Sequence, residues 1–205
     1  MNVAMVTPWT VKCGIYTYTR DLSEALFKKG VDVYIIRIPR FGIKTPDIMK
    51  LVADSIPEEV DLIHVQHEYG LYTGLEGTFY GVEGLKRLGK PVVTTMHSVG
   101  NFNVDPVVCK NSDVVVVHNE YCSRRLDHRN VIIPHGCGGP FKCPPEEECK
   151  KGLSIDPRAP LVGYVGFISP YKGLDRVIEA MTKIPDAGLL IGGGWHTAGA
   201  ETRYI

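Results

Sequence analysis

The chain has 205 residues, of which 44% are hydrophobic and 22% are charged, which is typical of a globular protein with room for one large domain or two small ones. Its 23 Lys and Arg residues balance its 23 Asp and Glu residues, so no overall positive charge is available to hold a nucleic acid or an anionic membrane. We therefore expect no nucleic-acid partner. Because the sequence has neither an apolar run long enough for a transmembrane segment nor a signal-peptide pattern, we also expect a cytoplasmic location.

Over the first 134 residues, apolar runs rich in β-branched side chains alternate with helical patterns. The predicted strands are 3–6, 31–38, 60–65, 91–95, 113–117 and 131–133, and the predicted helices are 15–29, 46–56 and 75–88. Most of these strands are continuous apolar runs, the pattern of a parallel sheet with helices on both faces. We therefore predict an α/β fold with a Rossmann-like doubly wound sheet as domain 1–134. Ligands of such sheets bind beyond the carboxyl ends of the strands.

Residues 135–159 are rich in Gly, Pro and Cys and are predicted to be a linker. After it, a strand at 161–165, a helix at 174–181 and a strand and turn at 189–194 restart the βα pattern. About 45 residues are too few to close an α/β domain. Residues 160–205 therefore predict the beginning of a second Rossmann-like domain.

The loop that follows the first strand contains a single glycine, Gly14. A dinucleotide-binding fingerprint needs three glycines at fixed spacing and a carboxylate after the second strand, where Arg37 stands instead, so this class is excluded. Gly14 either lets helix N–H groups face an anion or only eases the turn.

The turn 166–173 combines Gly166, Pro170, Lys172 and Gly173 ahead of an amphipathic helix. A lysine ammonium beside a helix N-terminus suits a diphosphate, whose negative charge grows when it leaves. The alternative is a solvated lysine in a surface turn.

Several strings, in their order and spacing, resemble the GT-B glycosyltransferases, in particular the large retaining group called glycosyl transferases group 1 or family 4-like. The resemblance covers the whole chain. The strings lie at 15–22, 61–70, 90–97, 112–117, 131–136, 163–175 and 190–194.

This resemblance implies two Rossmann-like domains, with a hydroxyl acceptor mainly on the first and a nucleotide-diphosphate sugar mainly on the second. The acceptor would be a glycan, a lipid-linked molecule or a small molecule, and transfer would proceed with retention. If the residue roles of the family hold for this chain, Gly14 would lie near the diphosphate, and His97 would lie near the transferred sugar as the catalytic residue. Lys172 with Gly173 would neutralise the leaving group. No cofactor is implied, because the nucleotide sugar is a co-substrate, and no metal is implied, because a lysine and helix dipoles can neutralise the charge that a divalent ion neutralises elsewhere.

Three features depart from the family pattern. Cys13 stands where a second loop glycine is common, and Phe167 stands where an arginine usually precedes the lysine. The family's pair of glutamates, seven residues apart and well downstream of Gly194, has no counterpart. The sequence thus resembles a truncated member. Besides a transferase, it could be a non-catalytic nucleotide-sugar or glycan-binding remnant, or a subunit completed by another chain.

Histidines follow several predicted strands. His67 with Glu68 could orient an acceptor hydroxyl or act as a base, or could simply belong to a polar loop. His97 could likewise only cap its loop, His64 is expected to be a core histidine, and His118 could be either a core or a site residue.

Four potential soft ligands, His135, Cys137, Cys143 and Cys149, lie within fifteen residues. Structural zinc sites typically place ligand pairs two to four residues apart, which these thiols do not match. We therefore expect free thiols, with a metal site and a disulfide as the alternatives.

Overall fold

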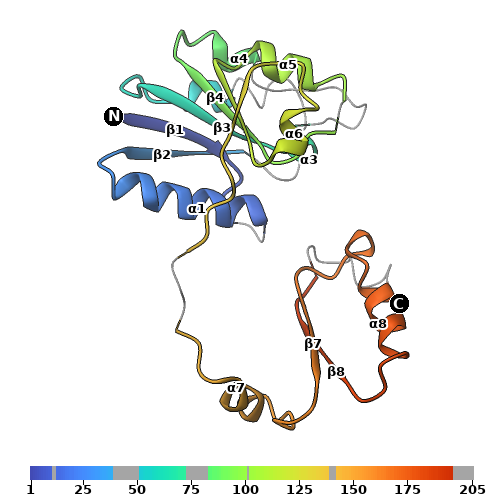
Figure 1. The fold of residues 1–205 in the computed structure, drawn as a ribbon. Helices are drawn as coiled ribbons and strands as arrows, with labels where there is room; N and C mark the ends of the chain where they lie inside the picture. The colour runs from blue at the N-terminus through green and yellow to red at the C-terminus, as the bar shows by residue number, and fades with distance from the viewer. Residues whose placement is uncertain (11–12, 39–50, 73–82, 101, 139–141, 196–205) are drawn as a thin grey trace. The chain divides into compact units, whose positions relative to one another are not determined.

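The computed structural model describes residues 1–10, 13–38, 51–72, 83–100, 102–138 and 142–195, and the chain divides into two compact units, Met1–Gly138 and Gly139–Ile205 (Figure 1). The α/β fold predicted from the sequence is confirmed. Within the described ranges, no helix is long and apolar enough to cross a membrane.

The first unit is built on a six-stranded sheet in which every pairing is parallel, with the strand order β2-β1-β3-β4-β5-β6. The strands are β1 (Asn2–Thr7), β2 (Asp32–Arg37), β3 (Leu62–His67), β4 (Val92–Met96), β5 (Val114–Val117) and β6 (Asn130–Ile132). The helices are α1 (Gly14–Phe27), α3 (Tyr69–Tyr72), α4 (Glu83–Lys86), α5 (Asp105–Lys110) and α6 (Glu120–Ser123), and residues 51–54 are also helical. The order of the strands reverses between β1 and β3, the position where doubly wound sheets bind ligands.

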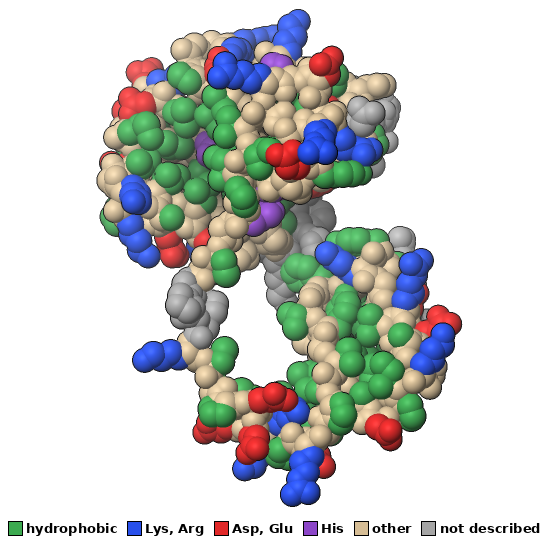
Figure 2. Space-filling model, viewed as in Figure 1, with side chains coloured by type: hydrophobic (Ala, Val, Ile, Leu, Met, Phe, Trp, Pro, Cys, Tyr) green, Lys and Arg blue, Asp and Glu red, His purple; other side chains and the backbone are tan. Residues whose placement is uncertain are grey.

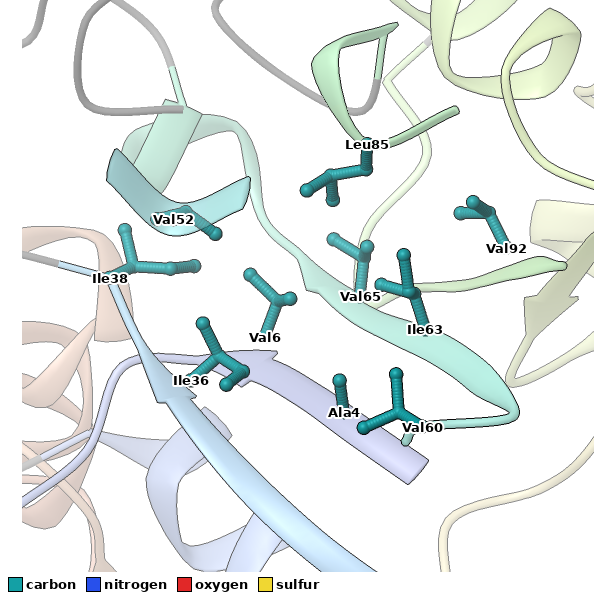
Figure 3. Close-up of a cluster of buried hydrophobic side chains, with 10 residues drawn as sticks. All are labelled: Ala4, Val6, Ile36, Ile38, Val52, Val60, Ile63, Val65, Leu85 and Val92. Carbon is teal, nitrogen blue, oxygen red and sulfur yellow. The ribbon is translucent and has the colours of Figure 1, made fainter. Parts of the chain in front are cut away.

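Successive side chains of a strand point to opposite faces of a sheet, and this alternation builds the core on one face. Its two clusters of buried side chains pack under the helical segments that cover this face. The first cluster, drawn in Figure 3, is Ala4, Val6, Ile36, Ile38, Val52, Val60, Ile63, Val65, Leu85 and Val92. The second is Met96, Val99, Val108, Cys109, Val115, Val117 and Leu126.

Helix α1 packs on β1 and β2 through its buried residues Ile15 and Thr19. The hydroxyl of Thr19 donates to the carbonyl of Ile15 and lies 2.9 Å from the hydroxyl of Thr7 at the end of β1. This contact between buried hydroxyls ties the start of α1 to the carboxyl end of the sheet.

The second unit contains α7 (Glu146–Gly152), β7 (Leu161–Val165), the short 3-10 helix η1 (Pro170–Lys172), α8 (Leu174–Met181) and β8 (Gly188–Gly192). Strands β7 and β8 pair in parallel, and the ladder continues past them, because the N–H of Gly166 donates to Gly192 and that of Ile168 to Gly194.

The predicted strands agree with the observed ones to within two residues at each end. Parts of the predicted helices 46–56 and 75–88 lie outside the described residues, as does the end of the predicted second domain after 195. The predicted linker 135–159 differs from the structure in one respect, because it contains the helix α7. Three glutamates in its first turn and two lysines in its last turn favour this helix.

Candidate functional site

The carboxyl ends of β3, β4, β5 and β6 meet at one edge of the parallel sheet, and a histidine lies at or just after the end of each. Three of them, His97, His118 and His135, bring their ring nitrogens within 4.8 Å of one another, and we call them the histidine cluster. The cluster follows from strand register. His97 comes two residues after Thr95, which pairs with Val116, and Val116 pairs in turn with Val131.

Side chains alternate between the two faces along each strand, so these paired positions place the cluster histidines on the face opposite the two core clusters, the first of which is drawn in Figure 3.

The ring of His97 is held by a side chain of β3. Its Nε2 lies 2.9 Å from Oε1 of Gln66, and Nε2 of Gln66 donates to Sδ of Met5 at 3.2 Å. Because a thioether sulfur can accept but not donate, this contact orients the amide so that its oxygen faces His97. Nε2 of His97 therefore carries the proton, and its Nδ1 bears the lone pair.

The ring of His118 is held through its other ring nitrogen, Nδ1. Its Nδ1 lies 2.9 Å from the carbonyl oxygen of Ile133, which can only accept, so in the neutral ring Nδ1–H donates and Nε2 bears the lone pair. Nε2 of His118 faces Nδ1 of His97 at 3.4 Å. The ring of His135 stacks on that of His118 with 3.7 Å between the centroids.

Tyr18 of α1 packs edge-on against all three rings of the cluster, with centroid distances of 4.8, 5.3 and 5.4 Å to His97, His118 and His135. His118 is buried, His97 is half-buried and His135 is exposed. The cluster is thus closed by α1 and opens to solvent at His135. Histidine side chains reach the surface of the first unit in the view of Figure 2.

Burial lowers the pKa of two of these imidazoles, those of His97 and His135. Desolvation, together with the neighbouring histidines, lowers the pKa of His97 to about 3. The same causes lower the pKa of His135. At neutral pH, His97 therefore presents a lone pair rather than a positive charge, and it can accept a proton or a hydrogen bond.

A set of hydrogen bonds separate from the histidine cluster orders the loop that follows His97. The hydroxyl of Tyr69 donates to Oδ1 of Asp105 at 2.6 Å and accepts from the N–H of Gly100 at 2.8 Å. The hydroxyl of Ser98 donates to Oε2 of Glu68 at 2.7 Å. Glu68, predicted to bind substrate, therefore lies beside the loop of His97 and holds it in place.

His67, also predicted to bind substrate, ends β3 with no exposed surface, and burial lowers its pKa to about 4. Its backbone carbonyl accepts from the N–H of His97. His64 is part-buried, and its Nε2 lies 2.8 Å from the hydroxyl of Thr95, as expected for a core histidine.

Gly14 is the first residue of α1 and is exposed. Cys13 precedes it in an extended conformation as the N-cap. The roles predicted for Gly14 and His97 stay predictions. The structure places both at the carboxyl edge of the sheet, after β1 and β4.

In the second unit, Lys172 ends the 3-10 turn and is exposed. Its Nζ lies 5.1 Å from the centre of the Tyr171 ring. Gly173 has a left-handed backbone with φ of 70° and caps α8, a conformation that a residue with a side chain adopts only at a cost. The predicted roles of Lys172 and Gly173 likewise stay predictions.

Cys137, Cys143 and Cys149 carry free, exposed thiols. Among the described residues, the group that could hold a metal ion contains His135 but none of these cysteines. The two histidines grouped with His135 are therefore distant from it in the sequence.

Sequence reasoning missed Gln66 and Tyr18 and did not connect His118 and His135 with His97. The sequence did contain a usable signal. Histidines follow the ends of several predicted strands, and if those strands are neighbours, the alternation of side chains puts these histidines on the same face of the sheet.

No family model matches the chain, and no curated protein matches it. Solved structures do. A glycosyltransferase from Rickettsia africae matches with a TM-score of 0.69 at 18% identity, covering 94% of this chain and 60% of that one. MurG from Acinetobacter baumannii matches with a TM-score of 0.54 at 13% identity, covering 98% of this chain and 62% of that one.

An alpha-glucosyltransferase in complex with UDP and a 13-mer DNA containing an HMU base matches with a TM-score of 0.59 at 11% identity, covering 99% of this chain and 59% of that one. The chain thus spans about 60% of the length of these neighbours. At such identities the likeness shows the fold, which agrees with the resemblance found in the sequence.

Proposed function

Because the chain has the fold of the GT-B glycosyltransferases, we propose that it takes part in transferring a sugar from a nucleotide-diphosphate sugar to a hydroxyl acceptor, with retention. The turn 166–173 carries this proposal, because it combines a lysine, a left-handed glycine and a helix N-terminus after a parallel strand. One of the structural neighbours was solved with UDP, which supports a donor of this class.

Lys172 and the start of α8 supply the charge that a diphosphate leaving group needs. The first N–H groups of an α-helix have no acceptor within the helix, and the helix dipole makes this end positive. Asp175 in the first turn of α8 partly offsets this positive end. The ammonium of Lys172 is therefore the main source of positive charge in this turn.

His97 suits the transferred sugar because its ring is neutral and fixed. With Nε2–H donated to Gln66, its Nδ1 is the atom that can accept a hydrogen bond from a sugar hydroxyl. Its lowered pKa keeps this lone pair available down to mildly acidic pH.

On each unit, basic and acidic side chains are interspersed over the face drawn in Figure 2, so we propose no nucleic-acid partner, although one neighbour was solved with DNA. The acceptor is proposed to be a glycan, a lipid-linked molecule or a small molecule with a free hydroxyl.

Calorimetry with UDP and UDP-glucose tests the donor site. Lys172→Ala removes a charge-assisted hydrogen bond worth about 1.5–3 kcal/mol, so it should weaken binding about 10- to 100-fold. Lys183→Ala is the matched control, because it removes the same charge from an exposed lysine just beyond α8. Equal affinities of the two variants would refute the role of Lys172.

Release of UDP from UDP-glucose in the presence of candidate acceptors tests catalysis by the same chain. Release of UDP by the unmodified chain that is lost in the His97→Ala variant would support the proposed transferase activity. Donor binding without turnover for any acceptor would instead favour a binding module or a subunit completed by another chain.

A further inference from the structure

We propose that the histidine cluster His97, His118 and His135 binds a zinc ion. The inference starts from two lone pairs that face each other. Nδ1 of His97 and Nε2 of His118 lie 3.4 Å apart, and each ring donates its only proton elsewhere, to Gln66 and to the carbonyl of Ile133. Two acceptors at this distance repel each other unless a proton or a cation lies between them.

A metal ion accounts for the separation of these two ring nitrogens. Imidazole is a favoured ligand of zinc and its neighbours among the transition metals, and tetrahedral zinc binds nitrogen at about 2.0–2.1 Å. In that geometry two ligand nitrogens lie about 3.3–3.4 Å apart. The observed 3.4 Å matches this separation.

His135 supplies the third ligand. All three ligand nitrogens lie within 4.8 Å of one another, so the nitrogens need approach by at most about 1.5 Å to reach tetrahedral spacing. The side chain of His135 is exposed and follows β6 outside any helix or strand, so its ring can make this movement. The fourth position would face solvent on the same side.

The contacts around the ligands are those that zinc histidines usually have. Such a histidine donates its second ring N–H to a carboxylate, a carbonyl or water, which fixes its tautomer. Gln66 and the backbone carbonyl of Ile133 fill this role for His97 and His118. Tyr18 closes the helix side of the cluster against all three rings.

This site differs from the cysteine-containing one considered for the sequence, and it does not depend on the proposed transfer reaction. Because zinc would occupy Nδ1 of His97, it would compete with any sugar hydroxyl for that atom.

Zinc binding to the full chain tests the proposal, with ZnCl₂ titrated against a chromophoric chelator. The parent for this experiment carries Cys137→Ser, Cys143→Ser and Cys149→Ser, which removes the exposed thiols as competing ligands. We expect one zinc ion per chain. His135→Gln should weaken binding more than about tenfold, and because its side chain is exposed, this substitution should leave the fold intact.

Two further variants separate ligand chemistry from general effects. Gln66→Leu keeps the ligands but removes the partner of His97, and it should weaken binding about 10- to 100-fold. His128→Gln, which removes an exposed histidine outside the cluster, should leave the affinity unchanged. The proposal is overturned if the parent binds no stoichiometric zinc, or if His135→Gln binds it as tightly as His128→Gln does.

Discussion

The part-buried His64 should make the first unit less stable in mild acid. Burial lowers its pKa from 6.5 to about 4 in the folded protein, whereas in the unfolded chain the ring returns to its ordinary value. Above pH 6.5 both states hold a neutral ring, and His64 adds no pH dependence. Between pH 6.5 and 4 the unfolded chain binds a proton that the folded one does not, so stability falls as the pH falls.

The magnitude follows from the two pKa values. At pH 5 the unfolded ring is almost fully protonated and the folded ring is almost fully neutral. By linkage, lowering the pH from 7 to 5 should remove up to about 2 kcal/mol of stability through His64 alone. His64→Gln should abolish this part of the loss, because an amide does not titrate and can still hydrogen-bond to the hydroxyl of Thr95.

Urea unfolding at pH 7 and pH 5 measures the effect. In a Trp195→Phe background, the fluorescence of Trp9 reports on the first unit, where its ring packs against Tyr16 of α1. His128→Gln is the control and should lose as much stability as the parent. The reasoning fails if His64→Gln also loses as much as the parent between the two pH values, because the ring would then not titrate as its burial requires.

Two other changes have expected outcomes. Tyr69→Phe removes the hydrogen bond to the buried carboxylate of Asp105 and should lower the free energy of unfolding by about 1.5–3 kcal/mol in urea titrations; an unchanged midpoint would show that water replaces the hydroxyl without cost. Gly193→Ala would drive its Cβ into the carbonyl of Gly166 and should destabilise the second unit by about 1–3 kcal/mol, measured by thermal unfolding. Gly194→Ala is its control, since no described atom lies within 4 Å of the added Cβ, and equal melting temperatures would contradict the close approach.

The strands could be predicted from the sequence because each is a nearly continuous run of apolar residues. The short helices were harder to predict. In α5, Val107 and Val108 are β-branched residues that lower helix propensity. The helix has only six residues, so its hydrophobic periodicity is too short to detect. In α7, the prolines before the helix concealed a clear charge pattern.

The site could be predicted only in part for a related reason. His97 became a candidate through the family resemblance and through its place after a strand, and both can be read from the sequence. Its neighbours depend on which strands pair and in which register, and Gln66 reaches His97 from a strand 31 residues earlier. Such contacts are set by tertiary packing and leave no local signal.

Strand β6 has a consequence for the histidine cluster that depends on its place in the sheet. It is a three-residue edge strand whose one partner among the described strands is β5, and its residues Val131 and Ile132 are exposed, as is Ile133 just after it. A strand held by one neighbour opens more readily than the strands inside a sheet. The carbonyl that orients His118 and the ring of His135 both belong to this segment, so each opening of the edge would dismantle the cluster. A ligand bound by all three rings would then link the ends of β4, β5 and β6. Amide hydrogen exchange in β6 would slow when the ligand binds.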